Sequence, residues 1–187
     1  MSDHRRHARE REASWRLFFA LVPPPALGQR IIELQRQLDL PARPVPHERI
    51  HITLAFLGEV PASRVDDLQR VAGMLQLPPV TLTLDRLGWF PRSQVAWLGC
   101  SEIPYGLGRF ESELREKLRD LGLKTDTRRW KPHLTLYRKM RTRFEKIGFE
   151  ALGWRLDGFQ LMRSRLLREG PEYSSVAQWK AAEIGPD

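Results

Sequence analysis

The stretch RIHITLAFLG, from Arg49 to Gly58, is the most informative part of this chain for its fold. It is an apolar run typical of a buried strand, interrupted by His51 and Thr53 two positions apart. Because side chains alternate faces along a strand, His51 and Thr53 project to one side, about 6–7 Å apart. The opposite, core-facing side is expected to receive Ile50, Ile52, Leu54 and Phe56. We therefore predict a strand with a polar pair on one face and an apolar anchor on the other.

The same pattern returns in KPHLTLYRK, from Lys131 to Lys139, inside a second apolar run. His133 and Thr135 share one face, and the leucines at 134 and 136 lie behind them. For one such motif, a satisfied structural histidine beside a β-forming threonine is the plainer interpretation. Composition gives roughly 0.2 chance His-x-Thr matches for the whole chain. Two matches in strand-like contexts therefore favour a shared site over coincidence.

Strand-like runs alternate with amphipathic helical patterns along the chain. The runs cover 15–22, 49–58, 80–90, 94–100, 131–139, 154–167 and 173–181, and the helical patterns cover 25–40, 63–77 and 105–121. Ser63 is expected to cap the second helix and Gly122 to end the third. Strands mixed with helices indicate an α+β fold, and each half places a helix before its His-x-Thr strand. We expect one domain over 15–181, a disordered tail at 1–14 and a short tail at 182–187.

The length and composition of the chain are those of an ordinary globular protein. The chain has 187 residues, 41% hydrophobic and 29% charged, enough to bury one substantial core. No run is long enough to cross a membrane, and the basic N-terminus lacks the apolar segment of a signal peptide. The single cysteine, Cys100, excludes an internal disulfide and is typical of a packed thiol. We expect a cytoplasmic protein.

The net charge of +8 is concentrated in one part of the chain. Residues 128–168 contain twelve Lys and Arg against three Asp and Glu, so the remainder is close to neutral. Such a window indicates an anionic partner, with RNA or DNA ahead of an acidic membrane surface. A solvated face is the alternative. The second His-x-Thr lies within this window, which favours the nucleic acid.

Two His-x-Thr strands facing one another suit phosphodiester chemistry. An imidazole titrates near pH 6.5, so one can accept a proton while the other donates one. Each threonine hydroxyl can donate a hydrogen bond to a phosphate oxygen as negative charge develops there. A zinc or iron site is the weaker alternative because neither motif brings a third ligand. A serine hydrolase is disfavoured because the chain has no G-x-S-x-G.

The motifs HITL (51–54) and HLTL (133–136) resemble the paired HxTx motifs of the two-histidine (2H) phosphoesterases. Within that superfamily, the chain is most similar to the RNA 2′,3′-cyclic phosphodiesterase family, historically called 2′-5′ RNA ligases. Supporting likenesses are RLFFAL (16–21), HITLAFLGEV (51–60), LTLD (82–85) and QVAWLG (94–99). The resemblance spans about residues 15–181 and leaves only the tails outside.

The resemblance implies a bilobal α+β fold. Two pseudo-symmetric lobes of antiparallel sheet would have helices packed outside and a central cleft carrying the two HxTx strands. It implies hydrolysis of an RNA 2′,3′-cyclic phosphate to a 2′-phosphomonoester, without a metal or other cofactor. It also implies reversible joining of RNA ends through a 2′-5′ linkage.

The resemblance also implies roles for individual residues. His51 would be the proton donor and His133 the proton acceptor, although the residues alone leave the opposite order open. Thr53 and Thr135 would bind the phosphate. Arg138 matches an arginine that follows the second motif in the family, and a guanidinium suits a phosphate. Strict strand alternation places Arg138 on the face opposite the histidines, so it reaches the cleft only if the strand twists or ends before it. We favour the phosphate contact, with RNA or solvent beyond the sheet as the alternative.

RNA is favoured over a small nucleotide by the basic window and by the aromatic residues beside the second motif. Trp130 and Tyr137 are candidate stacking platforms, with burial in the core as the alternative. Lys131 and Lys139 are candidate secondary contacts. We expect a monomer. Two rival functions remain: a non-catalytic module that binds RNA ends, and a phosphodiesterase acting on small nucleotides such as a cyclic phosphate of ADP-ribose.

Overall fold

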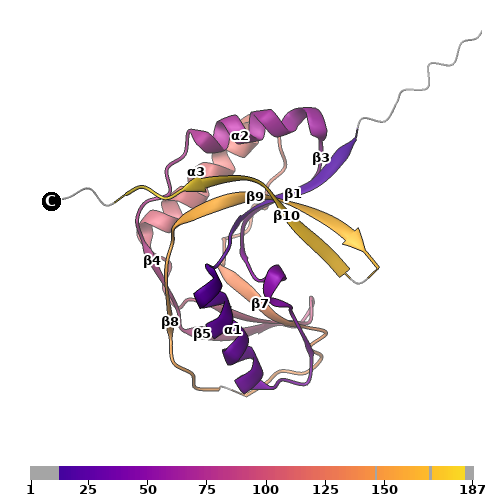
Figure 1. The fold of residues 1–187 in the computed structure, drawn as a ribbon, viewed down its shortest axis with the longest axis vertical. Helices are drawn as coiled ribbons and strands as arrows, with labels where there is room; N and C mark the ends of the chain where they lie inside the picture. Colours follow the sequence, from indigo (N-terminus) through magenta and orange to yellow (C-terminus); the bar gives the residue numbers. More distant parts are fainter. Residues whose placement is uncertain (1–12, 146, 169, 184–187) are drawn as a thin grey trace, which may run out of the picture.

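The computed structural model describes residues 13–145, 147–168 and 170–183, which form a mixture of strands and helices (Figure 1). The helices are α1 (Pro25–Leu38), α2 (Val65–Gly73) and α3 (Tyr105–Asp120), with 3-10 turns η1 (His47–Arg49) and η2 (Ala62–Arg64). The strands are β1 (Ser14–Leu21), β2 (Arg43–Pro44), β3 (Ile52–Pro61), β4 (Thr81–Leu84), β5 (Arg86–Phe90), β6 (Val95–Gly99), β7 (His133–Arg138), β8 (Leu152–Arg155), β9 (Gly158–Leu167) and β10 (Gly170–Lys180). The expected tails, 1–14 and 182–187, lie outside the described residues except for 13–14 and 182–183, and Ser14 already belongs to β1.

One antiparallel sheet contains both motif strands at its centre. Its order is β10-β9-β1-β3-β7-β6-β5, and β2 pairs with β7 beside this path. Strands β3 and β7 join through a single residue pair, Ile52 with Leu134. These are the residues between histidine and threonine in the two motifs. The sheet therefore consists of two halves that meet only at the motifs and diverge on either side. The predicted α+β class, an antiparallel sheet with helices packed against it, is confirmed.

The two halves of the sheet repeat one strand–helix–strand unit, and the helix of each unit packs against the other half. The order β1-α1-β3 recurs as β6-α3-β7, with the outer strand pairing antiparallel to the motif strand each time. Helix α1 packs beneath β7, where the Gln35 side-chain amide donates to the carbonyl of Leu136 (2.6 Å). Helix α3 packs on the other half, with Phe110 against Phe159 of β9 (4.8 Å between centroids). Figure 1 shows α2 and α3 over one half and α1 over the other.

The predicted helices differ from the observed ones mainly at α2. In α1 and α3 the apolar side chains at helical spacing are buried, among them Ile31 and Leu34 in α1 and Leu114 and Leu118 in α3. Gly122 follows the end of α3 with a φ of 76°. The second helix is shorter than predicted, because η2 takes up Ser63 and the N-cap is Arg64. It also ends at Gly73, ahead of the Pro78–Pro79 pair that disfavours helix in the residue before it.

Two of the predicted strand runs divide in the structure. The run 80–90 becomes β4 and β5, and the run 154–167 becomes β8 and β9. Strands β4 and β8 then pair with each other as a separate two-stranded sheet. In the described part of the chain, no helix combines the length and apolar character needed to cross a bilayer.

Candidate active site

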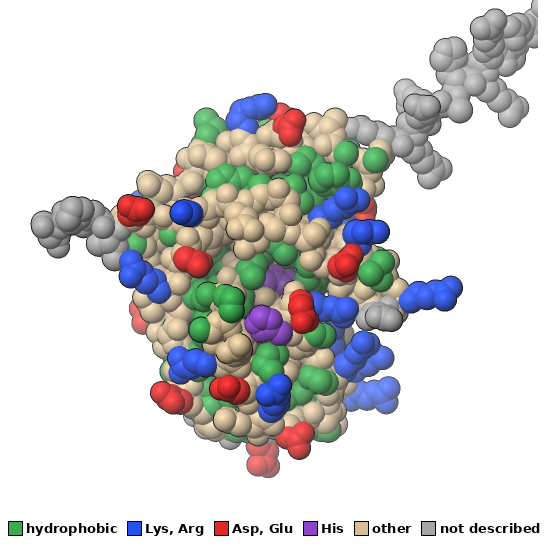
Figure 2. All heavy atoms as spheres, viewed as in Figure 1, with side chains coloured by type: hydrophobic (Ala, Val, Ile, Leu, Met, Phe, Trp, Pro, Cys, Tyr) green, Lys and Arg blue, Asp and Glu red, His purple; other side chains and the backbone are tan. Residues whose placement is uncertain are grey.

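A cleft of about 500 Å³ opens over the junction of β3 and β7. Its lining includes the five residues predicted to be catalytic or to bind the phosphate: His51, Thr53, His133, Thr135 and Arg138. The structure thus brings together two groups that lie some eighty residues apart in the chain. Figure 2 shows histidine side chains near the centre of the face, with lysines and arginines gathered along one side.

The register of β3 and β7 sets the arrangement of the four motif side chains. Ile52 pairs with Leu134 in an antiparallel ladder, and both of these side chains are fully buried. Continuing that register places His51 across from Thr135 and Thr53 across from His133. Each imidazole therefore stands beside its own threonine and faces the threonine of the other motif. A phosphate over the junction would be within reach of both pairs.

Each imidazole is held by the backbone of its own strand. His51 Nδ1 lies 2.9 Å from the carbonyl oxygen of Arg49, and His133 Nδ1 lies 2.7 Å from that of Lys131. A carbonyl oxygen only accepts hydrogen bonds, so Nδ1 carries the hydrogen in both rings. The same i−2 anchor leaves Nε2 of each ring available for proton transfer.

Aromatic rings surround both imidazoles. Phe18 and Tyr173 lie 4.9 and 5.1 Å from the His51 ring, and Phe90 lies 5.0 Å from the His133 ring, between centroids. Burial in this setting lowers the pKa of His51 to about 4, with smaller contributions from the charges of Arg138 and His133. Burial also lowers the pKa of His133. Both rings are therefore neutral in the free protein at pH 7.

A β-bulge brings Arg138 into the cleft. Thr135 pairs with Trp97 and Tyr137 pairs with the adjacent Ala96, so Leu136 is an extra residue on β7. Leu136 and Tyr137 both turn into the core, and the alternation restarts one residue late. Arg138 consequently shares the cleft face with His133, which corrects the expectation from strict alternation.

A second bulge, in the same place on β3, overturns the prediction that Phe56 is a core residue. Phe19 pairs with Ala55 and Ala20 with Thr53, so Leu54 is the extra residue. Leu54 and Ala55 are buried, whereas Phe56 is 46% exposed and lines the cleft. Both motif strands thus contain a bulge at the same position. In each strand the bulge directs the residue five positions after the histidine, Phe56 or Arg138, into the cleft.

Two arginines of the cleft come from outside the sequence motifs. Arg16 lies on β1 with its guanidinium 4.7 Å from the Phe56 ring centroid, and Arg49 precedes the first motif. Arg16 sits in a strand-like run that carries no sign of a site. Only its alternation with Phe18, which also lines the cleft, could have indicated its orientation.

The basic window contributes less to the cleft than its charge suggests, since Arg138 is its only basic residue in the lining. Lys131 and Lys139 are exposed outside the lining, and the bulge turns Lys139 away from the face of His133. Tyr137 is buried, with its hydroxyl donating to the carbonyl of Gln35, and Trp130 donates to the carbonyl of Thr53 (2.9 Å). Both aromatic residues are structural, as the alternative interpretation held.

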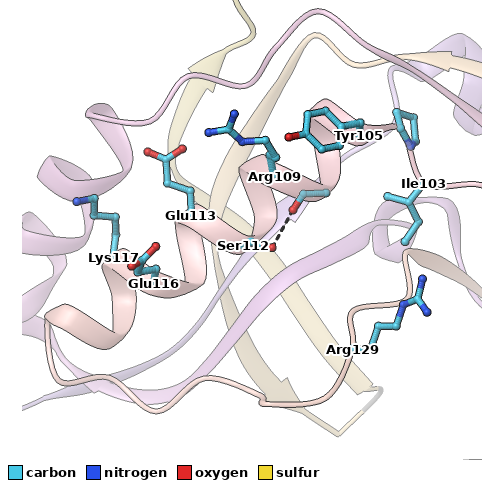
Figure 3. A pocket seen from close by; sticks show the side chains of 10 residues that line it. Ile103, Tyr105, Arg109, Ser112, Glu113, Glu116, Lys117 and Arg129 are labelled. Carbon is cyan, nitrogen blue, oxygen red and sulfur yellow. Dashed lines mark hydrogen bonds between the residues drawn. The ribbon is translucent and has the colours of Figure 1, made fainter.

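A second hollow, of about 700 Å³, lies along the exposed side of α3 (Figure 3). Its basic side chains are interspersed with the carboxylates of Glu113 and Glu116. Such mixed charge gives no field directed at an anion. Neither histidine motif reaches this hollow, so the cleft over β3 and β7 is the candidate active site.

Neither a metal cluster nor an activated thiol is found in the described ranges. Within residues 13–145, 147–168 and 170–183, no group of three or more His, Cys, Asp or Glu side chains is placed to hold a metal ion. Cys100 is half-buried, and burial together with the Asp85 carboxylate raises its thiol pKa. The polar side chains that line the cleft are imidazoles, hydroxyls and guanidiniums.

The lowered pKa of His51 predicts a loss of stability in mild acid. The unfolded chain binds a proton near pH 6.5, whereas the folded chain resists it until about pH 4, so stability falls as pH falls through this interval. We expect the free energy of unfolding to drop by roughly 2 kcal/mol between pH 7 and pH 5 through His51 alone. In urea denaturation at the two pH values, the free energy of unfolding of His51→Gln should fall less than that of the parent, because the variant has no imidazole at position 51. The exposed His47, changed to Gln, is the control, and a His51→Gln drop as large as the parent's would contradict the assignment.

Known proteins share both the sequence and the fold. The model of the 2′-5′ RNA ligase superfamily matches residues 23–166. RNA 2′,3′-cyclic phosphodiesterase of Escherichia coli is 34% identical over 170 residues, covering 88% of this chain and 95% of the relative. The enzyme of the same name from Methanocaldococcus jannaschii is 30% identical, covering 88% and 99%. The crystal structure of E. coli LigT with 3′-AMP superposes with a TM-score of 0.83 at 32% identity, covering 91% of this chain and all of that one. This chain belongs to the 2′-5′ RNA ligase superfamily.

Proposed function

We propose that this protein is an RNA 2′,3′-cyclic phosphodiesterase that uses His51 and His133 as its acid–base pair. The observation that carries the proposal is the matched pair of imidazoles, each anchored through Nδ1 to the carbonyl two residues earlier. The activity by which the E. coli and M. jannaschii relatives are named supports it. The crystal structure of E. coli LigT in complex with 3′-AMP, a ribonucleotide with a terminal phosphate, supports it as well.

The proposed step is a hydrolysis at phosphorus. His133 Nε2 removes a proton from a water molecule as the water oxygen bonds to phosphorus. The bond from phosphorus to O3′ breaks, and His51, which enters the step as the imidazolium with a proton on Nε2, protonates O3′ as it leaves. The products are a 2′-phosphomonoester and a free 3′-hydroxyl, and the two imidazoles have exchanged protonation states. Water returns them to the starting state.

Thr53, Thr135 and Arg138 are proposed to hold the phosphate. The hydroxyls can donate to the non-bridging oxygens from opposite sides of the junction, as the register of β3 and β7 suggests. Arg138 adds a fixed positive charge with two parallel donors, which suits two oxygens of one phosphate. Phe56, exposed at the equivalent position of the other motif, offers a face on which the terminal base can stack.

The same groups can join RNA ends. If the 5′-hydroxyl of a second RNA replaces water as the nucleophile, loss of O3′ leaves a 2′-5′ phosphodiester, and the reaction runs backwards through the same groups. No metal or other cofactor takes part in either direction of the proposed reaction. We propose a cytoplasmic monomer acting on RNA ends, tRNA fragments among them.

The pH dependence tests the acid–base roles. Because burial lowers both histidine pKa values in the free protein, kcat/KM should follow a bell with its maximum below pH 6.5. The bound phosphodiester anion favours the charged imidazoles, so kcat should peak at a higher pH than kcat/KM. Rates on a short cyclic-ended RNA from pH 4 to pH 9 measure both. A kcat/KM that rises without a maximum to pH 9 would exclude the general acid.

A turnover assay separates the enzyme from the RNA-end-binding module. A cyclic phosphate resists alkaline phosphatase, whereas a phosphomonoester is removed by it. We expect an excess of 5′-labelled, cyclic-ended RNA to become phosphatase-sensitive over many turnovers. Tight retention of RNA whose end stays resistant would identify a binding module instead.

A further inference from the structure

The cleft extends beyond the catalytic junction along the β9–β10 hairpin. The pairing of β9 with β1 stops at Arg16 with Ser164, whereas the pairing of β9 with β10 continues to Leu167 with Gly170. The end of this hairpin, residues 164–167 of β9 and 170–173 of β10, is therefore a two-stranded ribbon that projects past the sheet (Figure 1). One face of the ribbon lines the cleft, through Ser164, Leu166, Pro171 and Tyr173. The other face carries Arg165 and Glu172, whose salt bridge is 3.8 Å long.

The charge of the cleft exceeds what one phosphate needs. Its lining contains three arginines and no carboxylate, while a cyclic phosphodiester carries a single negative charge. Arg138 satisfies that charge at the junction. Arg16 and Arg49 remain, and within the described ranges neither guanidinium pairs with a carboxylate. This excess of positive charge matches a second phosphate.

The position of the two surplus arginines indicates where that phosphate lies. Arg16 is the cross-strand partner of Ser164, at the point where the ribbon leaves the sheet. Arg49 lies against the ribbon's other strand, because a Cβ built on Gly170 would come within 2.7 Å of its guanidinium. Gly170 also has a φ of 114°, which a side chain rarely adopts, so the close approach is built into the hairpin. Both guanidiniums therefore border the ribbon.

An apolar side chain accompanies these charges. Leu166 is 74% exposed on the cleft face of the ribbon, and Phe56 is exposed in the same cleft. A nucleotide consists of a flat, largely apolar base joined to an anionic backbone. An exposed leucine can contact such a base, while arginines in the same cleft can contact the phosphate. The ribbon is thus complementary in charge and in polarity to one further nucleotide.

We propose that the β9–β10 ribbon, with Arg16, forms a subsite for the nucleotide that precedes the cyclic end. Leu166 contacts the base of this nucleotide, and Arg16 contacts the phosphodiester that links it to the terminal one. The subsite rests on the proposed phosphodiesterase function and makes an RNA strand, rather than a mononucleotide, the preferred substrate.

Two substrates and a pair of leucine variants test the subsite. Adenosine 2′,3′-cyclic phosphate fills only the catalytic junction, whereas the dinucleotide ApA with the same cyclic end also reaches the ribbon. We expect kcat/KM of the parent to be at least about tenfold higher for the dinucleotide. Leu166→Ser should lower the dinucleotide value at least about fivefold and leave the mononucleotide value within about twofold. Leu167→Ser is the matched control, because Leu167 is also exposed on the hairpin but lies outside the cleft lining, and it should change neither value.

A second pair of variants tests the phosphate contact. Arg16→Gln should make the salt dependence of log kcat/KM for the dinucleotide shallower by about 0.7 per decade of salt. Arg163→Gln is its control, since Arg163 also stacks on an aromatic ring (Trp15, 4.2 Å) but lies outside the cleft lining, and its slope should match the parent's. Equal kcat/KM for the two substrates, or equal loss on both in Leu166→Ser, would overturn the subsite while leaving the phosphodiesterase intact. Hydrolysis of neither substrate would overturn the proposed function and the subsite with it.

Discussion

Replacing either His51 or His133 with alanine is expected to lower kcat on a cyclic-ended RNA by about 10³- to 10⁴-fold. Each imidazole moves one of the two protons in the step, and within the cleft lining the other groups are hydroxyls, guanidiniums and apolar side chains that cannot replace it at neutral pH. The double variant should lose little more than the worse single one, because the two groups act in one step. Single-turnover rates at saturating protein measure all three variants.

Two sets of variants serve as comparisons for the losses of kcat in His51→Ala and His133→Ala. His47→Ala removes an exposed histidine near the first motif and should leave kcat unchanged. Thr53→Val and Thr135→Val should each cost only about tenfold, because each removes one of several donors to the phosphate. Near-parental turnover in both His51→Ala and His133→Ala would exclude the acid–base pair.

Arg138→Gln is expected to reduce kcat/KM by about 10²- to 10³-fold. The variant keeps a polar side chain but loses the fixed charge and the paired donors that match two phosphate oxygens. It should also raise the pKa of His51, because the charge of Arg138 is one of the causes that lower it. The acid limb of the kcat/KM profile should therefore move toward neutral pH in this variant. Rates of parent and variant across pH 4 to pH 9 report both effects.

Lys139→Gln is the matched control for Arg138. Lys139 is the adjacent basic residue, exposed and outside the cleft lining, so its loss should change kcat/KM less than about twofold. Arg138→Lys separates charge from geometry, and we expect it to recover only part of the rate because an ammonium cannot donate to two oxygens in the same plane. Equal losses in Arg138→Gln and Lys139→Gln would mean that general positive charge, rather than this contact, matters.

The local patterns were sufficient to predict most of the elements and the heart of the site. Apolar spacing located α1 and α3 closely, and strand alternation placed each histidine and its threonine together on one face. These features depend on residues within a few positions of each other, where periodicity carries the information. The α2 helix was predicted too long because the pattern of Leu75 and Leu77 continues to be buried after the helix has ended.

The bulges account for the error at Phe56 and for the position of Arg138 in the cleft, which strict alternation alone does not predict. A bulge adds one residue relative to the neighbouring strand, and therefore depends on β1 and β6 rather than on the motif strand alone. Arg16 and Arg49 were missed because they reach the cleft from other elements, and the basic window drew attention to charges that mostly lie elsewhere. These positions depend on pairing between strands that are distant in the chain, and local periodicity in a single sequence does not predict such pairing.

The most direct test of the two-histidine phosphodiesterase uses a short RNA with a 2′,3′-cyclic phosphate end, incubated with the protein in excess EDTA. The 2′-phosphate and 3′-phosphate products are then resolved. The assignment of His51 to the departing O3′, with no metal in the step, predicts a clean 2′-phosphomonoester at an undiminished rate. A 3′-phosphate product, or a rate that disappears with the chelator and returns with a divalent cation, would contradict it.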